Sequence, residues 1–289
     1  MLDLAPQGLG SIRFLIPAVA FSLIALEFAA ARLAHRDSYD MGETGASLVI
    51  ALVHNLLRFV EAALLAVPFA FVYQHRLFDF DQISPIALGA LFFLSEFTYY
   101  WQHRAAHRIA WLWASHSVHH SATRLNLSAA IRLSWTGNLS GNFLFLLPLV
   151  WLGFHPLAVL VMFGASLLYQ FFVHADWAGR LGPLEWALNT PAHHRVHHAS
   201  NKTCLDKNYG GVLIIFDRLF GTFAEAPAGE TLRFGVLGAA PTNDVLRLNF
   251  GEWRRLFARA AETRTWFETV KVLFGPPKIA RRKPLQLAH

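Results

Sequence analysis

The apolar stretch FLFLLPLVWLGFHPLAVLVMFGASLLYQFF, residues 143–172, decides how the chain folds. Its middle, LGFHP at 152–156, places a glycine and a proline inside what would otherwise be one long helix. Proline removes a helical hydrogen bond and glycine favours a turn, so we predict two short helices folded as a hairpin that returns to its starting side. The flanking segments 103–138 and 173–240 are therefore expected to meet on one face.

The composition is typical of an integral membrane protein. The 289 residues are 54% hydrophobic and only 15% charged, whereas a soluble domain carries about a quarter charged residues. Three further apolar stretches, 14–34, 47–73 and 83–101, are each long enough to cross a bilayer once, which takes roughly 20 residues. The first lacks the cleavage site of a signal peptide, so we expect it to stay in the mature protein.

The predicted fold class is an all-α integral membrane helical bundle with three spans, a broken helical hairpin and a cytoplasmic histidine-rich helical cap. We expect N-terminal spans in 1–82, a histidine-rich domain in 83–240, and an amphipathic helix with a basic tail in 241–289. The tail KIARRKP at 278–284 indicates the cytoplasmic side, where lysine and arginine are in excess. The net charge of +6 fits anionic lipid better than nucleic acid, because the basic residues lie beside apolar stretches. The single cysteine, Cys204, excludes an internal disulfide.

Apolar residues recur at helical spacing from 250 to 274, interleaved with arginines and a lysine. A basic amphipathic helix of this kind can lie flat on a membrane surface. It can equally pack against the cytoplasmic domain, and the sequence leaves both alternatives open.

Three histidine clusters stand out: HRAAH at 103–107, HSVHH at 116–120 and HHRVHH at 193–198. Residues three and four apart lie on one face of a helix, so each cluster can direct its rings at one point. A lone histidine on a helix is usually a core residue. Three clusters are poorly explained that way, because grouped imidazoles repel when protonated or leave buried nitrogens unpaired. A metal ion resolves both problems, and neutral imidazole binds zinc, copper, iron or nickel.

We therefore predict a metal centre. Eight imidazoles exceed what one ion takes, so two ions with open coordination positions are expected. His174, at the end of the hairpin, is a ninth candidate, with Gln170 one turn before it. His193 neighbours His194 but points about 100° away on a helix and ranks lower. The predicted ligands are His103, His107, His116, His119, His120, His174, His194, His197 and His198.

Metal-bound imidazoles usually need a partner for their second ring nitrogen. Glu96 lies seven residues before His103, on the same helical face, and is the first candidate. Gln170, His193, Asp206 and Asn208 are the further candidates for this supporting role.

Two other functions would require different patterns of residues. A membrane haem carrier would need histidine pairs inside the spans. A metal-ion transporter would need polar residues near the bilayer midplane, and only residues 54–61 provide such a group. The chain shows no H-E-x-x-H protease motif and no Gly-rich phosphate loop.

The order and flanks of the histidine clusters resemble the fatty acid hydroxylase and sterol desaturase superfamily. The resemblance rests on EFTYYWQHRAAH at 96–107, HSVHHSATRLNLSAAIR at 116–132, NTPAHHRVHH at 189–198 and DKNYGGVLIIFDRLFGTF at 206–223. Three boxes in this order are far more specific than any one alone. The match covers roughly 90–275 and is closest in wording to the alkylglycerol monooxygenase and bacterial sterol desaturase-like branch.

The resemblance implies two non-haem iron ions on the cytoplasmic face, which use O2 to hydroxylate or desaturate a lipid C–H bond. The substrate would be a sterol, fatty acyl or alkyl lipid. It implies that the nine histidines named above are ligands; Gln170 stands where some members have another histidine, and Glu96 where members often have aspartate. A separate electron donor, ferredoxin-like or cytochrome b-type with its reductase, would be needed. The membrane would be the inner membrane of a bacterium or the endoplasmic reticulum of a eukaryote.

Overall fold

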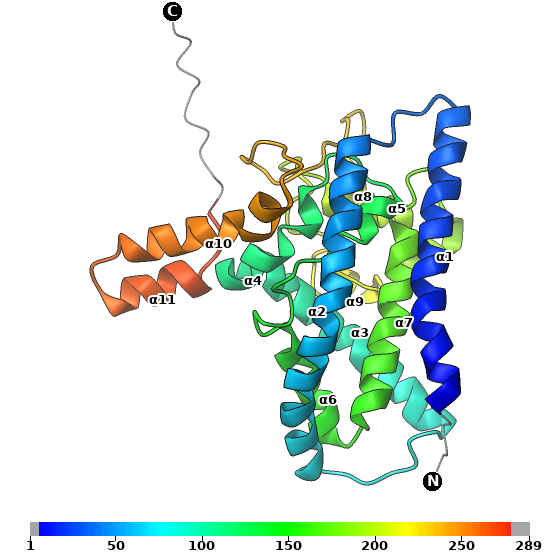
Figure 1. Cartoon of the computed structure of the whole chain (residues 1–289), viewed down its shortest axis with the longest axis vertical. Coiled ribbons are helices and arrows are strands. Elements are labelled where there is room, and N and C mark those ends of the chain that lie inside the picture. Colours follow the sequence, from blue (N-terminus) through cyan, green and yellow to red (C-terminus); the bar gives the residue numbers. More distant parts are fainter. Residues whose placement is uncertain (1–5, 279–289) are drawn as a thin grey trace, which may run out of the picture.

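The computed structural model describes residues 6–278, with side chains from residue 15 onward. Within these residues the chain forms helices and no strand; two isolated bridges, Leu188 with Leu213 and Ala199 with Phe234, are the only β pairings there. The all-helical prediction is confirmed. Long helices stand side by side, and shorter ones gather toward one end (Figure 1).

Four long helices form the bundle: α1 (Pro6–Leu33), α2 (Met41–Gln74), α3 (Pro85–Arg108) and α7 (Pro156–Val173). Their starts follow from local chemistry. Asp40 accepts a hydrogen bond from the backbone N–H of Glu43 (2.8 Å) before α2, and Ser84 caps α3, where a proline occupies the first turn.

Three of these helices are long and apolar enough to cross a membrane: α1 from Leu15, α2, and α7. This corrects one detail of the prediction, because the third candidate span is α7 and not the stretch 83–101. The second half of α3 carries Glu96, two tyrosines and the first histidines, which lowers its hydropathy. The spans turn large apolar side chains outward, such as Phe59 and Val67 on α2, as expected of a lipid-facing surface.

The predicted hairpin is confirmed, with unequal arms. After the 3-10 turn η2 (Asn142–Leu146), α6 (Leu147–Leu152) runs only six residues before Gly153 reverses the chain into α7. Gly153 has φ 122°, and a Cβ there would lie 2.2 Å from the carbonyl oxygen of Phe78. Only glycine fits this turn. The end of α7 thereby reaches the histidine-rich end of the bundle.

Short helices form the cap: α4 (Ala110–His116), η1 (His119–Ser121), α5 (Leu127–Ala130), η3 (Gly182–Trp186), α8 (Pro191–His198) and α9 (Ile215–Leu219). Arg132 fastens the cap to the bundle. Its guanidinium is buried and donates to the hydroxyls of Ser47 (3.1 Å) and Ser121 (3.0 Å) and to the carbonyl of Glu43 (2.9 Å). This ties α2 to the turn that carries two of the histidines.

Helices α10 (Val245–Ala261) and α11 (Trp266–Phe274) project sideways from the cap (Figure 1). Their inner side packs on α4, where Leu256 joins a core cluster with Ala110 and Ala114. Large apolar residues remain exposed on the outside, and α11 has no buried residue. Packing against the cap is thus confirmed, and the helical pair keeps a free apolar face. Contact of that face with the membrane stays a prediction. Of the basic tail, 279–289 lies outside the described residues.

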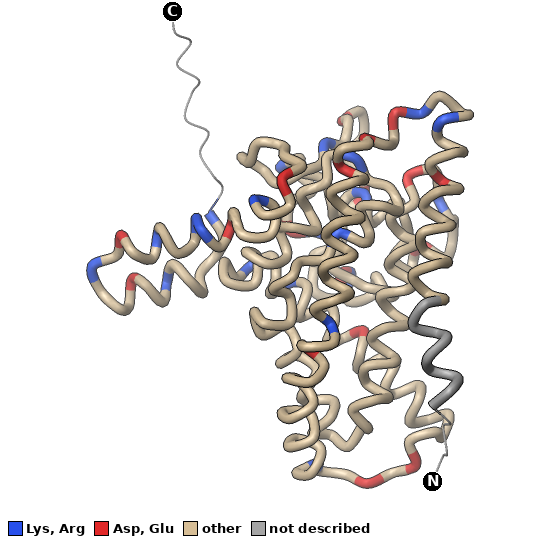
Figure 2. The backbone as a smooth tube through the Cα atoms, in the orientation of Figure 1, with Lys and Arg blue, Asp and Glu red and all other residues tan. Residues whose placement is uncertain are grey.

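Charged residues are few along the long helices and gather in the cap and on α10 and α11 (Figure 2). The polar residues at 54–61 on α2 form hydrogen bonds with residues outside this helix. The Nδ1 of His54 contacts the carbonyl of Ser134 (3.1 Å), and Glu61 accepts from Asn138 (2.8 Å).

Candidate metal centre

The nine predicted histidines converge in two groups in the cap, although they come from five helices and the turns beside them. Within each group one ring nitrogen per residue lies within 4.8 Å of all the others. The first group, which we call the five-histidine group, is His103, His107, His116, His120 and His197; the four-histidine group is His119, His174, His194 and His198.

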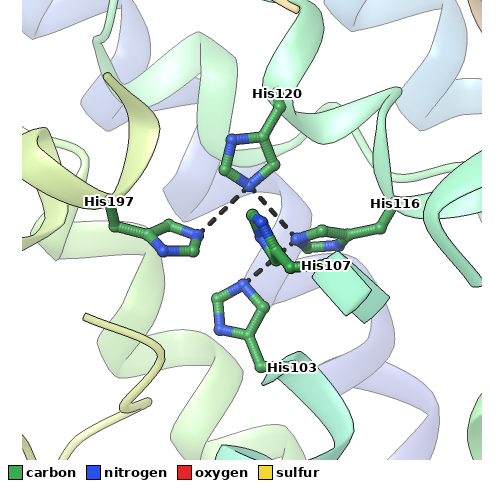
Figure 3. Close-up of side chains that lie close together, drawn as sticks. All are labelled: His103, His107, His116, His120 and His197. Carbon is green, nitrogen blue, oxygen red and sulfur yellow. Dashed lines mark hydrogen bonds between the residues drawn. The ribbon is translucent and has the colours of Figure 1, made fainter. Parts of the chain in front are cut away.

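The rings of the five-histidine group point at a common centre (Figure 3). The Nε2 atoms follow one another closely: His103 to His116 at 3.1 Å, His116 to His120 at 3.2 Å, and His120 to His197 at 3.1 Å. His107 completes the group, and its Nε2 is buried without a hydrogen-bond partner.

Neutral imidazoles alone cannot satisfy this chain of contacts. The Nδ1–H of His103 donates to the carbonyl of Tyr209 and that of His197 to the carbonyl of Lys207, each at 2.8 Å, so both Nε2 atoms carry lone pairs. His116 and His120 would then each need a proton on Nε2, which places two N–H groups face to face. A cation at the meeting point removes the conflict, because every Nε2 can present a lone pair to it.

The four-histidine group has the same character. The Nε2 of His174 lies 3.2 Å from that of His119 and 3.1 Å from that of His194, which in turn lies 3.0 Å from the Nε2 of His198. The Nδ1–H of His174 donates to the carbonyl of Gln170 (2.7 Å), one turn back on α7. The Nδ1 atoms of His119 and His194 are buried and unpartnered.

Burial keeps these rings in the ligating form. Desolvation, reinforced by neighbouring imidazoles, holds the pKa of His103, His116 and His198 well below its ordinary value. Burial lowers the pKa of His174 and His197 to about 4, against the opposing effect of the carbonyls that accept from them. The rings are therefore neutral at physiological pH, as metal binding requires.

The two groups adjoin each other. His119 and His120 are consecutive and serve different groups, and the rings of His120 and His198 stack with centroids 4.3 Å apart. The donor set fits two soft or borderline cations held side by side, each by imidazole nitrogen.

Glu96 departs from the prediction, because its carboxylate contacts no imidazole. It accepts from the hydroxyl of Ser166 (2.6 Å) and from the backbone N–H groups of Val212 (2.6 Å) and Leu213 (3.1 Å). Seven helical residues advance the chain about 10 Å, which is too far for the carboxylate to reach His103. Glu96 instead anchors the 209–213 loop.

Two of the other candidates do lie beside the second ring nitrogen of a predicted ligand. Gln170 contributes its backbone carbonyl to His174, while its amide donates to Ser166 (3.2 Å). Asp206 pairs with Arg108 (3.0 Å), and its other oxygen lies 4.0 Å from Nδ1 of His107.

Asn208 and His193 touch no predicted ligand ring through their side chains. Asn208 is fully buried and donates to the carbonyls of His193 (3.0 Å) and Ala224 (2.8 Å). The ring of His193 faces Phe223 and lies outside both groups, as its lower rank anticipated.

Sequence reasoning missed Asp217, which is fully buried and accepts from the N–H groups of Tyr209 and Gly210 and from the hydroxyl of Thr222, all at 2.7 Å. Asp217 and Glu96 thus pin both ends of the loop whose Tyr209 carbonyl orients His103. The only signal was an acidic residue in the apolar run VLIIFDRLF at 212–220.

The comparisons with known proteins agree with this geometry. The fatty acid hydroxylase family model matches residues 88–222. Human alkylglycerol monooxygenase is 39% identical over 73% of this chain and 46% of its own length. The ornithine lipid hydroxylase OlsE of Rhizobium tropici is 35% identical over 53% of this chain and 46% of its own. The chain thus spans less than half the length of these relatives. No solved structure gives a significant match.

Proposed function

The chain belongs to the fatty acid hydroxylase family through residues 88–222, and from that premise we propose that it is a membrane-bound non-haem di-iron oxygenase. It uses O2 to oxidise a C–H bond of a lipid. The observation that carries the proposal is the convergence of nine neutral imidazoles, seven of them buried and two half-buried, into two adjoining groups.

The nine histidines are the proposed iron ligands, with one iron in the five-histidine group and one in the four-histidine group. Two bound irons would supply the electrons and the oxidising power that C–H oxidation by O2 needs. The protein's own part is to keep the rings neutral and aimed. The carbonyls of Tyr209, Lys207 and Gln170 hold the Nδ1 protons of three ligands, which leaves each Nε2 free to bind metal.

The names of the relatives support a lipid substrate and favour hydroxylation over desaturation, because they are a monooxygenase of alkylglycerol and a hydroxylase of ornithine lipid. A separate electron donor, ferredoxin-like or cytochrome b-type with its reductase, delivers the reducing equivalents.

The proposed topology sets the cap in the cytoplasm. Arg32 and Arg36 at the cap end of α1, together with the basic residues of α10 and α11, support this side. The corresponding division of the chain is N-terminal spans in 1–82, the catalytic domain in 83–240, and the α10–α11 part with its tail in 241–289. The host membrane is the bacterial inner membrane or the endoplasmic reticulum.

Iron content and a visible spectrum of the purified protein test the proposal, alongside lipid profiles of cells with and without the gene. We expect two irons per chain, no haem band, and a lipid heavier by one oxygen or lighter by two hydrogens. His119→Ala should lower the iron content and abolish that product. His75→Ala is the matched control, because His75 is exposed just after the end of α2 and its ring bonds only to the carbonyl of Phe71. Full activity of His119→Ala, or a haem spectrum, would refute the proposal.

A further inference from the structure

The free apolar face of α10 and α11 consists of two stripes of large side chains. The α10 stripe is Leu246, Phe250, Trp253 and Phe257, and the α11 stripe is Trp266, Phe267, Val270 and Phe274. The members of each stripe recur at helical spacing, so they lie on one side of their helix. Seven of the eight are exposed, Trp266 most of all at 77%. A contiguous apolar surface of this kind marks an interaction site.

Trp111 of α4 joins the two stripes. Its ring centroid lies 6.0 Å from that of Phe257 and 6.0 Å from that of Phe274, so both stripes reach the same place. The indole N–H of Trp111 donates to the carbonyl of Ser140 (3.0 Å). Ser140 lies two residues before η2, which opens the apolar hairpin. The free apolar face therefore adjoins the point where the chain passes from the cap into the membrane hairpin.

The length of α2 gives the height of this helical pair relative to the bilayer. α2 has 34 residues, whereas about 20 residues cross the hydrocarbon core. Counted from the far end of α2 at Gln74, a stretch of that length reaches back to Asn55. α10 meets α2 closer to the cap than this, because Leu248 shares a buried cluster with Ala46 and Ile50. The pair therefore branches from the bundle at the edge of the hydrocarbon core, on the side of the cap.

The orientation of the pair agrees with its height. Both helices lie across the long axis of the bundle, and α11 lies on the side of α10 that is farther from the top of the cap (Figure 1). Since the spans run across the bilayer, a pair that lies across them runs along its surface. The α11 stripe is also one-sided: Val270 and Phe274 are about one turn apart, whereas the exposed Glu268 lies about 160° around the helix from Val270.

Basic residues accompany the free apolar face. Residues 245–278 contain seven arginines and lysines against three glutamates, and they are spread along both helices (Figure 2). Arg254, Arg264 and Lys271 are exposed. Exposed aromatic rings beside long basic side chains fit the surface of an anionic membrane, where the rings enter the head-group boundary and the cations meet phosphates. The height at the edge of the hydrocarbon core favours lipid over a soluble protein as the partner.

We propose that α10 and α11 rest on the bilayer surface beside the bundle, with the free apolar face in the lipid and the basic residues on anionic head groups. The backbone N–H of Ala110 donates to the carbonyl of Gly275 (2.9 Å), which ties the end of α11 to the start of α4. α4 ends at the proposed ligand His116. Membrane contact thereby supports the edge of the cap that carries part of the five-histidine group. The inference stands apart from the proposed function, because it requires neither iron nor a lipid substrate.

The first test is fluorescence quenching of a dye on Val270→Cys, with Glu268→Cys as the matched control on the opposite side of α11. Both are made with Cys204→Ala, which removes the single native thiol. The full chain is reconstituted in vesicles of equal parts phosphatidylcholine and phosphatidylglycerol. We expect lipids with a nitroxide near the head group to quench the dye at 270, and aqueous iodide to quench it several times less than the dye at 268.

The second test asks whether the pair selects anionic lipid. The nitroxide is placed either on phosphatidylglycerol alone or on phosphatidylcholine alone, at the same content. We expect the labelled phosphatidylglycerol to quench the dye at 270 more strongly, and Arg264→Gln with Lys271→Gln to remove this difference. Lys202→Gln with Arg233→Gln is the matched control, because it removes the same charge at exposed positions outside the pair. The control should keep the difference.

Three results would overturn the proposal. Equal quenching of both dyes by iodide, with none by lipid, would place the free apolar face in water. A dye at 270 that neither iodide nor lipid quenches would show that protein covers the face, such as a second copy of the chain. Equal quenching by the two labelled lipids would refute the selection of anionic head groups. None of these measurements depends on bound iron or on an oxidised product, so this inference and the proposed function can fail separately.

Discussion

Asp217→Asn tests whether the 209–213 loop positions the proposed ligands. The carboxylate of Asp217 accepts three hydrogen bonds at 2.7 Å: Oδ1 from the N–H of Tyr209 and the hydroxyl of Thr222, and Oδ2 from the N–H of Gly210. An asparagine of the same shape keeps the oxygen for the first two and turns an NH2 group toward Gly210. One buried N–H then loses its acceptor and meets another donor.

The magnitude follows from this geometry. A buried donor without a partner costs about 1–3 kcal/mol of folding free energy. The loop that this weakens presents the Tyr209 carbonyl to the Nδ1–H of His103. Loss of a residue that orients a ligand typically lowers metal affinity about 10–100-fold. Asp217 acts one step further away, through the backbone. We therefore expect about tenfold lower iron affinity in the five-histidine group and no change of affinity in the four-histidine group.

The assay is iron per chain after equilibration with increasing chelator. The variant should release one iron at about tenfold lower chelator activity than the wild type and the second iron at the wild-type value. Asp244→Asn is the control, because Asp244 also accepts from two backbone N–H groups (3.0 Å each) but at the start of α10. Equal weakening of both irons, or of neither, would show that the loop does not position His103.

Three further outcomes are expected. Gly153→Ala should lower the melting temperature in detergent by several degrees, because its Cβ would meet the Phe78 carbonyl at 2.2 Å. Gly164→Ala is the control and should be neutral or slightly stabilising, because Gly164 has open space around it. Equal melting temperatures of the two variants would contradict the account of the turn. Arg132→Met should cost about 1–3 kcal/mol of folding free energy, measured by denaturant unfolding, because buried neutral acceptors on two elements lose their donor. An unchanged free energy of unfolding would contradict the fastening role of this side chain. A nitroxide attached to the cysteine of Phe267→Cys should, in bilayers, be accessible to oxygen and shielded from a water-soluble nickel reagent. The reason is that Phe267 is 64% exposed on the free apolar face of α11. Free access of the nickel reagent to the nitroxide would place this face in water.

Those features of this protein that local chemistry determines can be predicted from the sequence alone. Helical spacing puts His103 and His107, or His194 and His198, on one face regardless of what surrounds them. Gly153 followed by Pro156 breaks an apolar helix wherever it occurs. These local rules sufficed to predict the helical membrane bundle, the reversal of the chain, and the nine histidines that converge.

The tertiary structure alone decided how those histidines are shared and what holds them. His119 and His120 are adjacent in sequence but join different groups, because the 3-10 turn directs their rings apart and the partners arrive from α3, α7 and α8. The carbonyls that orient three of the rings could not be predicted, since every residue has a carbonyl and only packing brings a given one to a given ring. Glu96 shows the same limit: its helical position is readable from sequence, but its partners lie 116 and 117 residues away, and long-range contacts of this kind arise from how helices pack.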